Sequence, residues 1–447
     1  KGAKAMATVY VREGRVYQVG RISITGVTLF PEVEIWLLMR IKTGMDAAQS
    51  RIKATVEAVQ SYYTSRGYLD TVVKQVVRPG EQAGAGVVDI VFQVTEGKLT
   101  RIRNVVIQGN TQTRDKVIRR EVEVYPGEVY NEAKVSRSER RLMNLGFFSS
   151  ARSHPADAGI QGTKDVVFEV EEGRTGNLAM GVGFSSIDNL MGFLELSQGN
   201  FDISGPPFKG AGQKVKLGMS LSETRQKYNI SFVEPWFLDR ALRLGVDLYH
   251  SAVDYTEYDT TRTGGAIELS KALPFASRVG LEYRLERVTL SDIQNTNEYI
   301  NIDTGESFYF ERESDRMESS MTLSLSHDSR NNAFFPTQGT RARLSGTVSG
   351  GPLGFDSDLY EIKLSVSQYV PLWWEHVLSV RLQGEVVEAY GDMADVPITD
   401  RLFLGGAYTL RGFHYRDVGP KVRLADAAEG DMSYKPIGGK SLGLANV

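Results

Sequence analysis

The chain has 447 residues, with 52 Lys and Arg against 55 Asp and Glu, and a formal net charge of −3. This balance lacks the basic excess of a nucleic-acid-binding surface, so no nucleic-acid partner is expected. The absence of cysteine excludes zinc ribbons, thiol nucleophiles and disulfide scaffolds, and the five histidines are too scattered to suggest a metal or cofactor site.

The first half of the chain repeats a short pattern, Val-x-Glu-Gly, at residues 11–14, 94–97 and 170–173. Between the copies the same elements recur: an alternating strand that ends in glycine, two helices, and two more strands. The order β-α-α-β-β within about 80 residues is typical of a compact α+β module. We predict the last strand of an earlier module at 1–14, one module at 15–97, and a second at 98–173.

From Gly176 onward the hydrophobic period changes to two. Met321, Leu323 and Leu325, for example, alternate with small polar residues. Segments of about 9–11 residues with this alternation are typical of outer-membrane β-barrels. No run of about 18 apolar residues occurs, so a membrane crossing would require such a barrel. We predict an antiparallel transmembrane β-barrel over 174–447, with eleven strands before residue 388 and a short twelfth near 441–447.

The connections between these strands differ in length on the two sides. The short ones fall at 237–240, 274–277, 331–339 and 371–376, and the long ones at 291–316 and 389–437. Trp236, Trp373 and Trp374 lie at short turns, where amphipathic rings form an interfacial belt. A soluble β-sandwich would show the same alternation along its strands but not this asymmetry. The barrel is therefore favoured, with its short turns on the periplasmic side.

The segment 402–413 reads LFLGGAYTLRGF and is followed by Gly419-Pro420-Lys421. It resembles the sixth extracellular loop of the BamA-like outer-membrane insertase family. The repeats resemble the POTRA domains of that family, and 232–236 (FVEPW) resembles its fourth barrel strand. The family barrel has about sixteen strands. The resemblance therefore implies a chain that holds about twelve of sixteen strands and is truncated at both ends.

The resemblance also implies a function: folding and inserting β-barrel proteins into the outer membrane of a Gram-negative-type bacterium, with the POTRA domains in the periplasm. The implied partners are unfolded outer-membrane proteins, periplasmic lipoproteins of an assembly complex, and outer-membrane lipids. No enzyme motif occurs, so the chain is not expected to be an enzyme. A two-partner-type secretion pore and a TamA-like translocation and assembly protein share the repeats and the loop, and both stay open as alternatives.

Within the loop, the resemblance assigns roles to a set of residues: Gly405, Gly406, Leu410, Arg411, Gly412 and Phe413. Arg411 would reach into the lumen and pair with acidic residues on strands beyond the present C-terminus. Gly412 would allow a tight bend, and Phe413 would anchor the loop by packing. Asp328 and Arg330 end an inward-facing row near the periplasmic rim, where a structural network and ordinary rim charges are equally good interpretations.

The first barrel strand is the second candidate site. Its apolar positions are Leu178, Met180, Val182 and Phe184, and between them stand Asn177, Gly181 and Gly183. Glycines weaken strand pairing, and an opened edge could accept an incoming strand by β-augmentation. In the family, a client's last strand is templated at this seam. The alternative is that the glycines only leave room for side chains in the lumen or for sharp curvature of the strand.

A third candidate lies on the first predicted helix of the second module. Arg119, Arg120 and Glu121 form a charged patch there. The resemblance implies that this module docks partner lipoproteins. A solvated helix face is the equally plausible alternative.

Overall fold

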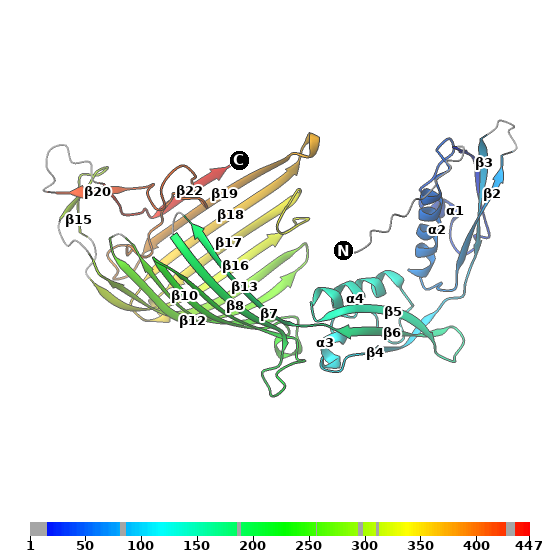
Figure 1. Ribbon diagram of the computed structural model, residues 1–447, viewed down its shortest axis with the longest axis horizontal. Coiled ribbons are helices and arrows are strands. Elements are labelled where there is room, and N and C mark those ends of the chain that lie inside the picture. The colour runs from blue at the N-terminus through cyan, green and yellow to red at the C-terminus, as the bar shows by residue number, and fades with distance from the viewer. Residues whose placement is uncertain are drawn as a thin grey trace, which may run out of the picture. The chain divides into compact units, whose positions relative to one another are not determined.

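The computed structural model describes residues 16–80, 86–185, 189–255, 257–293, 298–309, 313–425 and 434–447. The strand predicted at 1–14 lies outside the described residues. The chain divides into two compact units, residues 1–174 and 175–447 (Figure 1).

The first unit contains two α/β modules with the same element order. The first module consists of β1 (Gln18–Thr25), α1 (Glu32–Trp36), α2 (Gln49–Thr64), β2 (Val72–Pro79) and β3 (Val87–Thr95). The second consists of β4 (Arg101–Gln108), α3 (Asp115–Arg119), α4 (Glu132–Asn144), β5 (Phe148–Asp157) and β6 (Thr163–Glu172). In each sheet the last strand lies in the centre, parallel to the first and antiparallel to the other. The predicted order β-α-α-β-β is confirmed.

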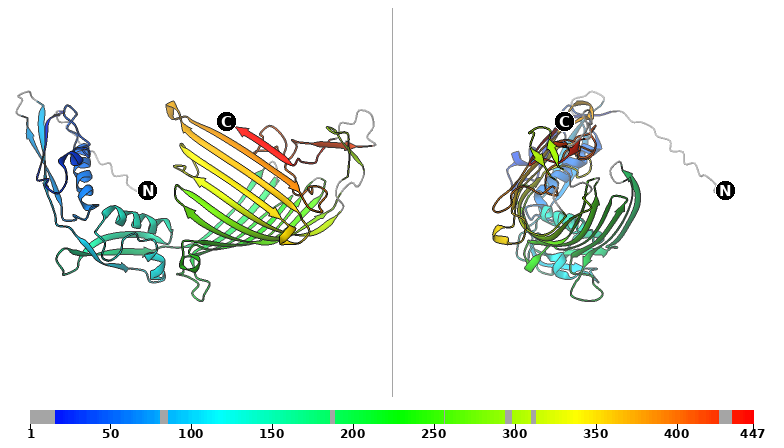
Figure 2. Two further views of the ribbon diagram at one scale, coloured as in Figure 1. Left: turned by 180° about the vertical axis from the view of Figure 1, so that it is seen from behind. Right: turned by 90° about the vertical axis from the view of Figure 1, so that its left-hand side faces the viewer.

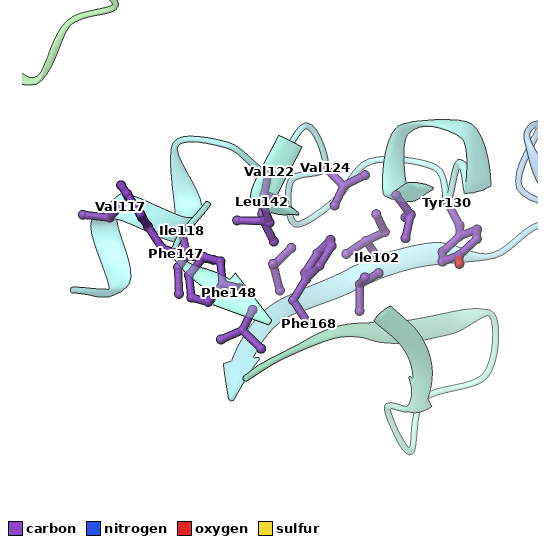
Figure 3. Close-up of a cluster of buried hydrophobic side chains, with 14 residues drawn as sticks. Ile102, Val117, Ile118, Val122, Val124, Tyr130, Leu142, Phe147, Phe148 and Phe168 are labelled. Carbon is purple, nitrogen blue, oxygen red and sulfur yellow. The ribbon is translucent and has the colours of Figure 1, made fainter. Parts of the chain in front are cut away.

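Each module buries one core between its helices and one face of its sheet. In the second module, α4 starts at Asn131, whose side chain accepts a hydrogen bond from the Lys134 amide at 3.0 Å. Val135 and Leu142 lie two turns apart on the buried side of this helix. Figure 3 shows Phe168 of the central strand projecting into the cluster that these side chains help to form. The core is thus local to the module.

The recurring Val-x-Glu-Gly pattern has a structural cause. Glu172 accepts hydrogen bonds from the backbone amides of Thr111, Gln112 and Thr113, and so caps the loop that follows β4. Glu96 caps the corresponding loop of the first module. Burial alone would raise the pKa of both carboxyls, but the hydrogen bonds outweigh it, so each pKa lies below its usual value. The motif glutamate therefore ties the end of the module to its beginning.

The glycines that end the first strand of each module meet the same motif. Gly26 and Gly109 have φ of 82° and 91°. A Cβ at either position would lie 2.0 Å from the carbonyl oxygen of the motif valine, Val94 or Val170. Only glycine satisfies both the conformation and the close approach.

The second unit is a twelve-stranded antiparallel sheet in which neighbouring strands follow chain order (Figure 1). Its strands are β7 (Gly176–Ser185), β8 (Asn189–Phe201), β9 (Gln213–Ser222), β10 (Arg225–Glu234), β11 (Arg243–Asp254), β12 (Asp259–Leu273), β13 (Ser277–Ser291), β16 (Ser314–Asp328), β17 (Gly339–Ser349), β18 (Leu359–Pro371), β19 (Val377–Ala389) and β22 (Ser441–Asn446). The sheet curls into an incomplete barrel (Figure 2). The predicted count of eleven strands plus a short twelfth is confirmed.

The two faces of the curled sheet differ in chemistry. A cavity of about 780 Å³ marks the inner face, and its lining includes Glu195, Lys216, Arg262 and Glu286. The alternate positions, such as Leu323, carry exposed apolar side chains. This arrangement of apolar residues outside and polar residues inside suits a wall between lipid and water.

The rim of the long connections also carries two short ones, of two residues between β9 and β10 and of four residues between β11 and β12, so the predicted asymmetry of length is only partial. The four short turns named in the sequence analysis share the opposite rim, since the strands are antiparallel and sequential. Two of them contain 3-10 turns, η1 (Phe237–Asp239) and η3 (Trp373–Glu375). The long connections on the other rim are more ordered than the sequence predicts. They hold a separate sheet of four short strands in the order β15 (Ser307–Phe308), β14 (Tyr299–Asn301), β20 (Lys421–Leu424) and β21 (Lys435–Pro436), and η2 (Gly351–Leu353) lies in a third connection. Burial of Tyr299 and Val422 in a shared apolar cluster explains this order.

Candidate functional site: the edge strand and the long loop

The first candidate site is β7, the edge strand at one end of the twelve-stranded sheet. All ten of its residues pair with β8, from Gly176 opposite Gln198 to Ser185 opposite Asn189. In the described parts of the chain, no second strand pairs with β7, and β22 forms the opposite end of the sheet. The backbone N–H and C=O groups on the other side of β7 thus have no strand partner among the described residues.

The side chains of β7 separate cleanly between the two faces. Its apolar residues, Leu178, Met180, Val182 and Phe184, are 57–79% exposed on the outer face. Asn177, Gly181 and Gly183 alternate with them and share the inner face. The strand therefore presents apolar side chains on its outer face and small or polar residues on its inner face.

The two glycines of β7 are not equivalent. A Cβ at Gly181 would come 2.6 Å from the ring of Phe193, which lies across it on β8. At Gly183 the nearest atom is a Met191 carbon at 3.9 Å, so a side chain there would fit. Gly181 thus makes room for an inward-facing ring. No such contact explains Gly183.

The second candidate site is the long loop between β19 and β22, where the LRGF motif lies. Gly405 is buried, has a φ of 113°, and would place a Cβ 2.1 Å from the His414 carbonyl oxygen. Gly406 has a φ of 93° and donates its amide hydrogen to the Phe413 carbonyl at 3.1 Å. The glycine pair therefore allows the backbone at 405–406 to pass close to the backbone at 413–414, and this close approach positions the motif between them.

The motif residues themselves lie at the surface of this unit. Arg411 is exposed, and its side chain makes no hydrogen bond or ion pair with a described residue. Leu410 is half-buried, and Gly412 bends the chain with a φ of 92°. Phe413 is 53% exposed among the described residues, and its role as an anchor of the loop stays a prediction. Phe403, from the same loop, packs against the buried aromatic cluster.

Arg416, which the sequence analysis did not single out, holds the loop that Arg411 was expected to hold. Its guanidinium carbon lies 3.6 Å from the ring centre of Phe403 and 4.2 Å from that of Tyr255. It also donates a hydrogen bond of 2.6 Å to the hydroxyl of Tyr258. Tyr255 directly follows β11 and Tyr258 directly precedes β12, so these contacts attach the loop to the barrel wall.

A second attachment lies deeper, on the inner face. Asp400 of the long loop accepts hydrogen bonds from Arg262 on β12, at 2.8 Å, and from Arg316 on β16. Arg262 also pairs with Glu286 at 3.0 Å, and Arg316 with Glu318 at 2.6 Å. We call these five residues the Asp400 network.

The Asp400 network is largely shielded from water. The side chain of Arg316 is only 10% exposed, and that of Asp400 15%. Charges removed from water in this way are stable only as a complete set of pairs. Two arginines on the wall therefore share one carboxylate of the loop, which fixes the loop against the wall.

The remaining predicted residues form local pairs. Asp328 and Arg330 make a two-pronged ion pair at the rim, with N–O distances of 2.7 and 2.8 Å. In the second module, α3 ends at Arg119, so Arg120 and Glu121 follow the helix rather than lying on it, contrary to prediction. The chain turns there because Val122 enters the core.

The charges of this patch are mostly engaged within the module. Arg119 pairs with Asp115, one turn earlier on the same helix. Glu121 is 12% exposed and pairs with Arg141 of α4 at 3.0 Å. The exposed part of the patch is therefore smaller than the sequence suggests.

No helix in the described ranges is long and apolar enough to cross a membrane. Among the described residues, no group of acidic or histidine side chains is placed to hold a metal ion.

A family model described as "Omp85 superfamily domain" matches residues 208–447, which is more than half of the chain. The chain belongs to the Omp85 superfamily. Its two modules match the POTRA repeat, described as "Surface antigen variable number repeat", at 17–97 and 100–173. The predicted resemblance to BamA-like proteins is thereby confirmed, and with it the outer-membrane location with POTRA domains in the periplasm.

Individual relatives agree with this family. The outer membrane protein assembly factor BamA of Nitratidesulfovibrio vulgaris is 26% identical over 445 residues, covering 98% of this chain and 52% of that protein. BamA of Neisseria meningitidis serogroup B is 25% identical, and the match covers 94% of this chain and 53% of that protein. The crystal structure of BamA from Haemophilus ducreyi lacking POTRA domains 1–3 shares the fold, with a TM-score of 0.75 and 23% identity. The match covers 96% of this chain and 82% of that one. The chain spans about half the length of the curated relatives it matches.

Proposed function

We propose that this chain is the strand-templating part of a protein that assembles other β-barrels in the outer membrane. The observation that carries this proposal is β7, which pairs along its whole length with β8 and has no described partner on its other side. An incoming strand can continue the sheet there with main-chain hydrogen bonds, which need no particular sequence. The names of the BamA relatives, as assembly factors, support the same activity.

The activity needs no covalent chemistry. The client gains backbone hydrogen bonds at an edge that already lies at membrane depth, where an unsatisfied backbone group costs several kcal/mol. The apolar outer face of β7 keeps this edge in contact with lipid. The clients in this proposal are unfolded outer-membrane proteins, and outer-membrane lipids form the surroundings of the seam.

The second POTRA module would receive periplasmic lipoproteins of an assembly complex. Arg119, half-exposed at the end of α3, is the accessible part of the charged patch that we propose for this contact.

The test is the rate at which a small unfolded barrel becomes protease-resistant in liposomes that contain the complete protein. A photo-crosslinker at Ala179, on β7, should capture the client, whereas one at Leu323, in the middle of the sheet, should not. Acceleration with crosslinking at Ala179 alone supports the proposal. No acceleration, together with a large single-channel conductance, would contradict it and favour the two-partner-type secretion pore.

A further inference from the structure

Four arginines gather on the inner face of the barrel wall, close to the rim where the chain enters the sheet. They are Arg278 on β13, Arg341 and Arg343 on β17, and Arg381 on β19. A serine on each intervening strand separates the arginines. Ser326 on β16 stands opposite both Arg278 and Arg343 in register, and Ser367 on β18 stands opposite both Arg341 and Arg381. We call these six residues the Arg–Ser patch.

None of the four arginines makes a hydrogen bond or an ion pair with a carboxylate in the described part of the chain, although the Asp328 carboxylate stands across from Arg341 and feels its charge. Arg278 donates to the Ser270 hydroxyl at 3.3 Å, and Arg381 to the Tyr408 carbonyl at 3.1 Å. Arg341 and Arg343 are exposed and make no hydrogen bond or ion pair with a described residue. The patch therefore presents concentrated positive charge to the lumen.

This lack of partners is unusual for the inner face, where several other basic side chains are paired. Lys216 lies 2.6 Å from Glu195, Arg243 lies 2.8 Å from Glu268, and Lys363 lies 2.8 Å from Glu385. Asp328, which stands opposite Arg341 in register, is already held by both prongs of Arg330. A ligand that brings its own carboxylates would complete the patch.

The spacing of the patch selects for an extended chain. Arg341 and Arg343 alternate on one strand, so their Cα atoms are about 6.6 Å apart. Carboxylates at positions i and i+2 of an extended polypeptide have the same spacing and point to the same side. Barrel strands expose one such polar face, because their inward-facing residues alternate with lipid-facing ones.

We propose that the Arg–Ser patch binds extended, acidic segments of a client polypeptide, recognised by carboxylates at alternate positions, before they reach β7. This inference rests on the proposed function and specifies the class of client segment. The serines between the arginines leave the floor of the patch free of large side chains, so an extended backbone can approach it. Guanidinium forks then meet the carboxylates in pairs.

The test measures peptide binding in the absence of any folding reaction, so it is independent of whether the protein accelerates insertion. Fluorescein-labelled ten-residue peptides of Val, Thr and two Asp would be titrated by anisotropy against the liposome-reconstituted protein in about 0.15 M salt. In one peptide the two aspartates are separated by one residue, and in another of identical composition they are adjacent. A third carries asparagine at the alternate positions.

The expected result is binding of the alternate-aspartate peptide, with at least about tenfold weaker binding of the other two. The Arg341→Gln/Arg343→Gln variant should lose this preference. The control Lys214→Gln/Lys227→Gln removes the same charge from inward positions on β9 and β10 and should keep it. Equal binding of the adjacent and alternate peptides, equal loss in both variants, or full displacement by millimolar inorganic phosphate would each overturn the proposal.

Discussion

Replacing Asp400 with asparagine should release the long loop from the barrel wall while leaving the strands intact. The carboxylate accepts from Arg262 and from Arg316, and an amide of the same size offers only one accepting oxygen and turns its N–H₂ toward a guanidinium. Breaking a buried ion pair in this way costs about 3–5 kcal/mol. Because every 1.4 kcal/mol is tenfold, the undocked population should rise by roughly two to three orders of magnitude.

Hydrogen exchange by mass spectrometry, in lipid nanodiscs, would measure this release in peptides covering 396–404. Peptides from β18 and β19 serve as internal references, and their exchange should not change. The matched control is Asp395→Asn in the same loop, whose more exposed pairs with Arg401 and Lys440 should contribute less than about 1 kcal/mol. Unchanged exchange in Asp400→Asn, or equal changes in both variants, would refute the inference that the network holds the loop.

Three further outcomes follow from the site geometry. Gly181→Val should lower the stability of the β7–β8 pairing by about 1–3 kcal/mol, because its Cβ meets an aromatic ring, whereas Gly183→Val should be tolerated in the same heat-modifiability assay. The pKa of Glu172 is lowered in the folded second module, so the ionised carboxylate stabilises the module at pH values above the unfolded pKa of about 4.3, and this stabilisation is lost as the pH falls through the folded pKa. In urea unfolding of residues 98–173, Glu172→Gln should abolish that part of the pH dependence of the unfolding free energy. Arg416→Gln should increase exchange in its own loop segment, and Arg411→Gln should not.

The sequence predicted the strands and the four short turns at one rim correctly because these are local properties. A wall with lipid on one side and water on the other imposes an alternation on each strand that can be read residue by residue. The module order was likewise predictable from its glycines and its recurring glutamate. The strands inside the long connections were missed because each is only two to four residues long and forms by pairing across loops.

The candidate sites were predicted less completely. The motif lies in the long loop, but Arg411 and Phe413 are exposed there, and the contacts of this loop with the wall come from Arg416 and Asp400. Tyr258 lies 158 residues from Arg416, and Arg262 lies 138 residues from Asp400. No local pattern reports contacts at such separations. Arg262 and Arg316 could have been noted only as charges at inward positions of their strands.

The sequence by itself therefore determined two POTRA modules, twelve barrel strands, their inner and outer faces, and the family. These follow from periodicity, turn residues and short motifs, each set by neighbours along the chain. Only the tertiary structure decided which charges meet, namely that Asp400 is shared by two strands and that the four arginines of the Arg–Ser patch make no hydrogen bond or ion pair with a described carboxylate. The physical reason is register: cross-strand neighbours are fixed by how the whole sheet pairs, and a shift of one residue would exchange every inward side chain for an outward one.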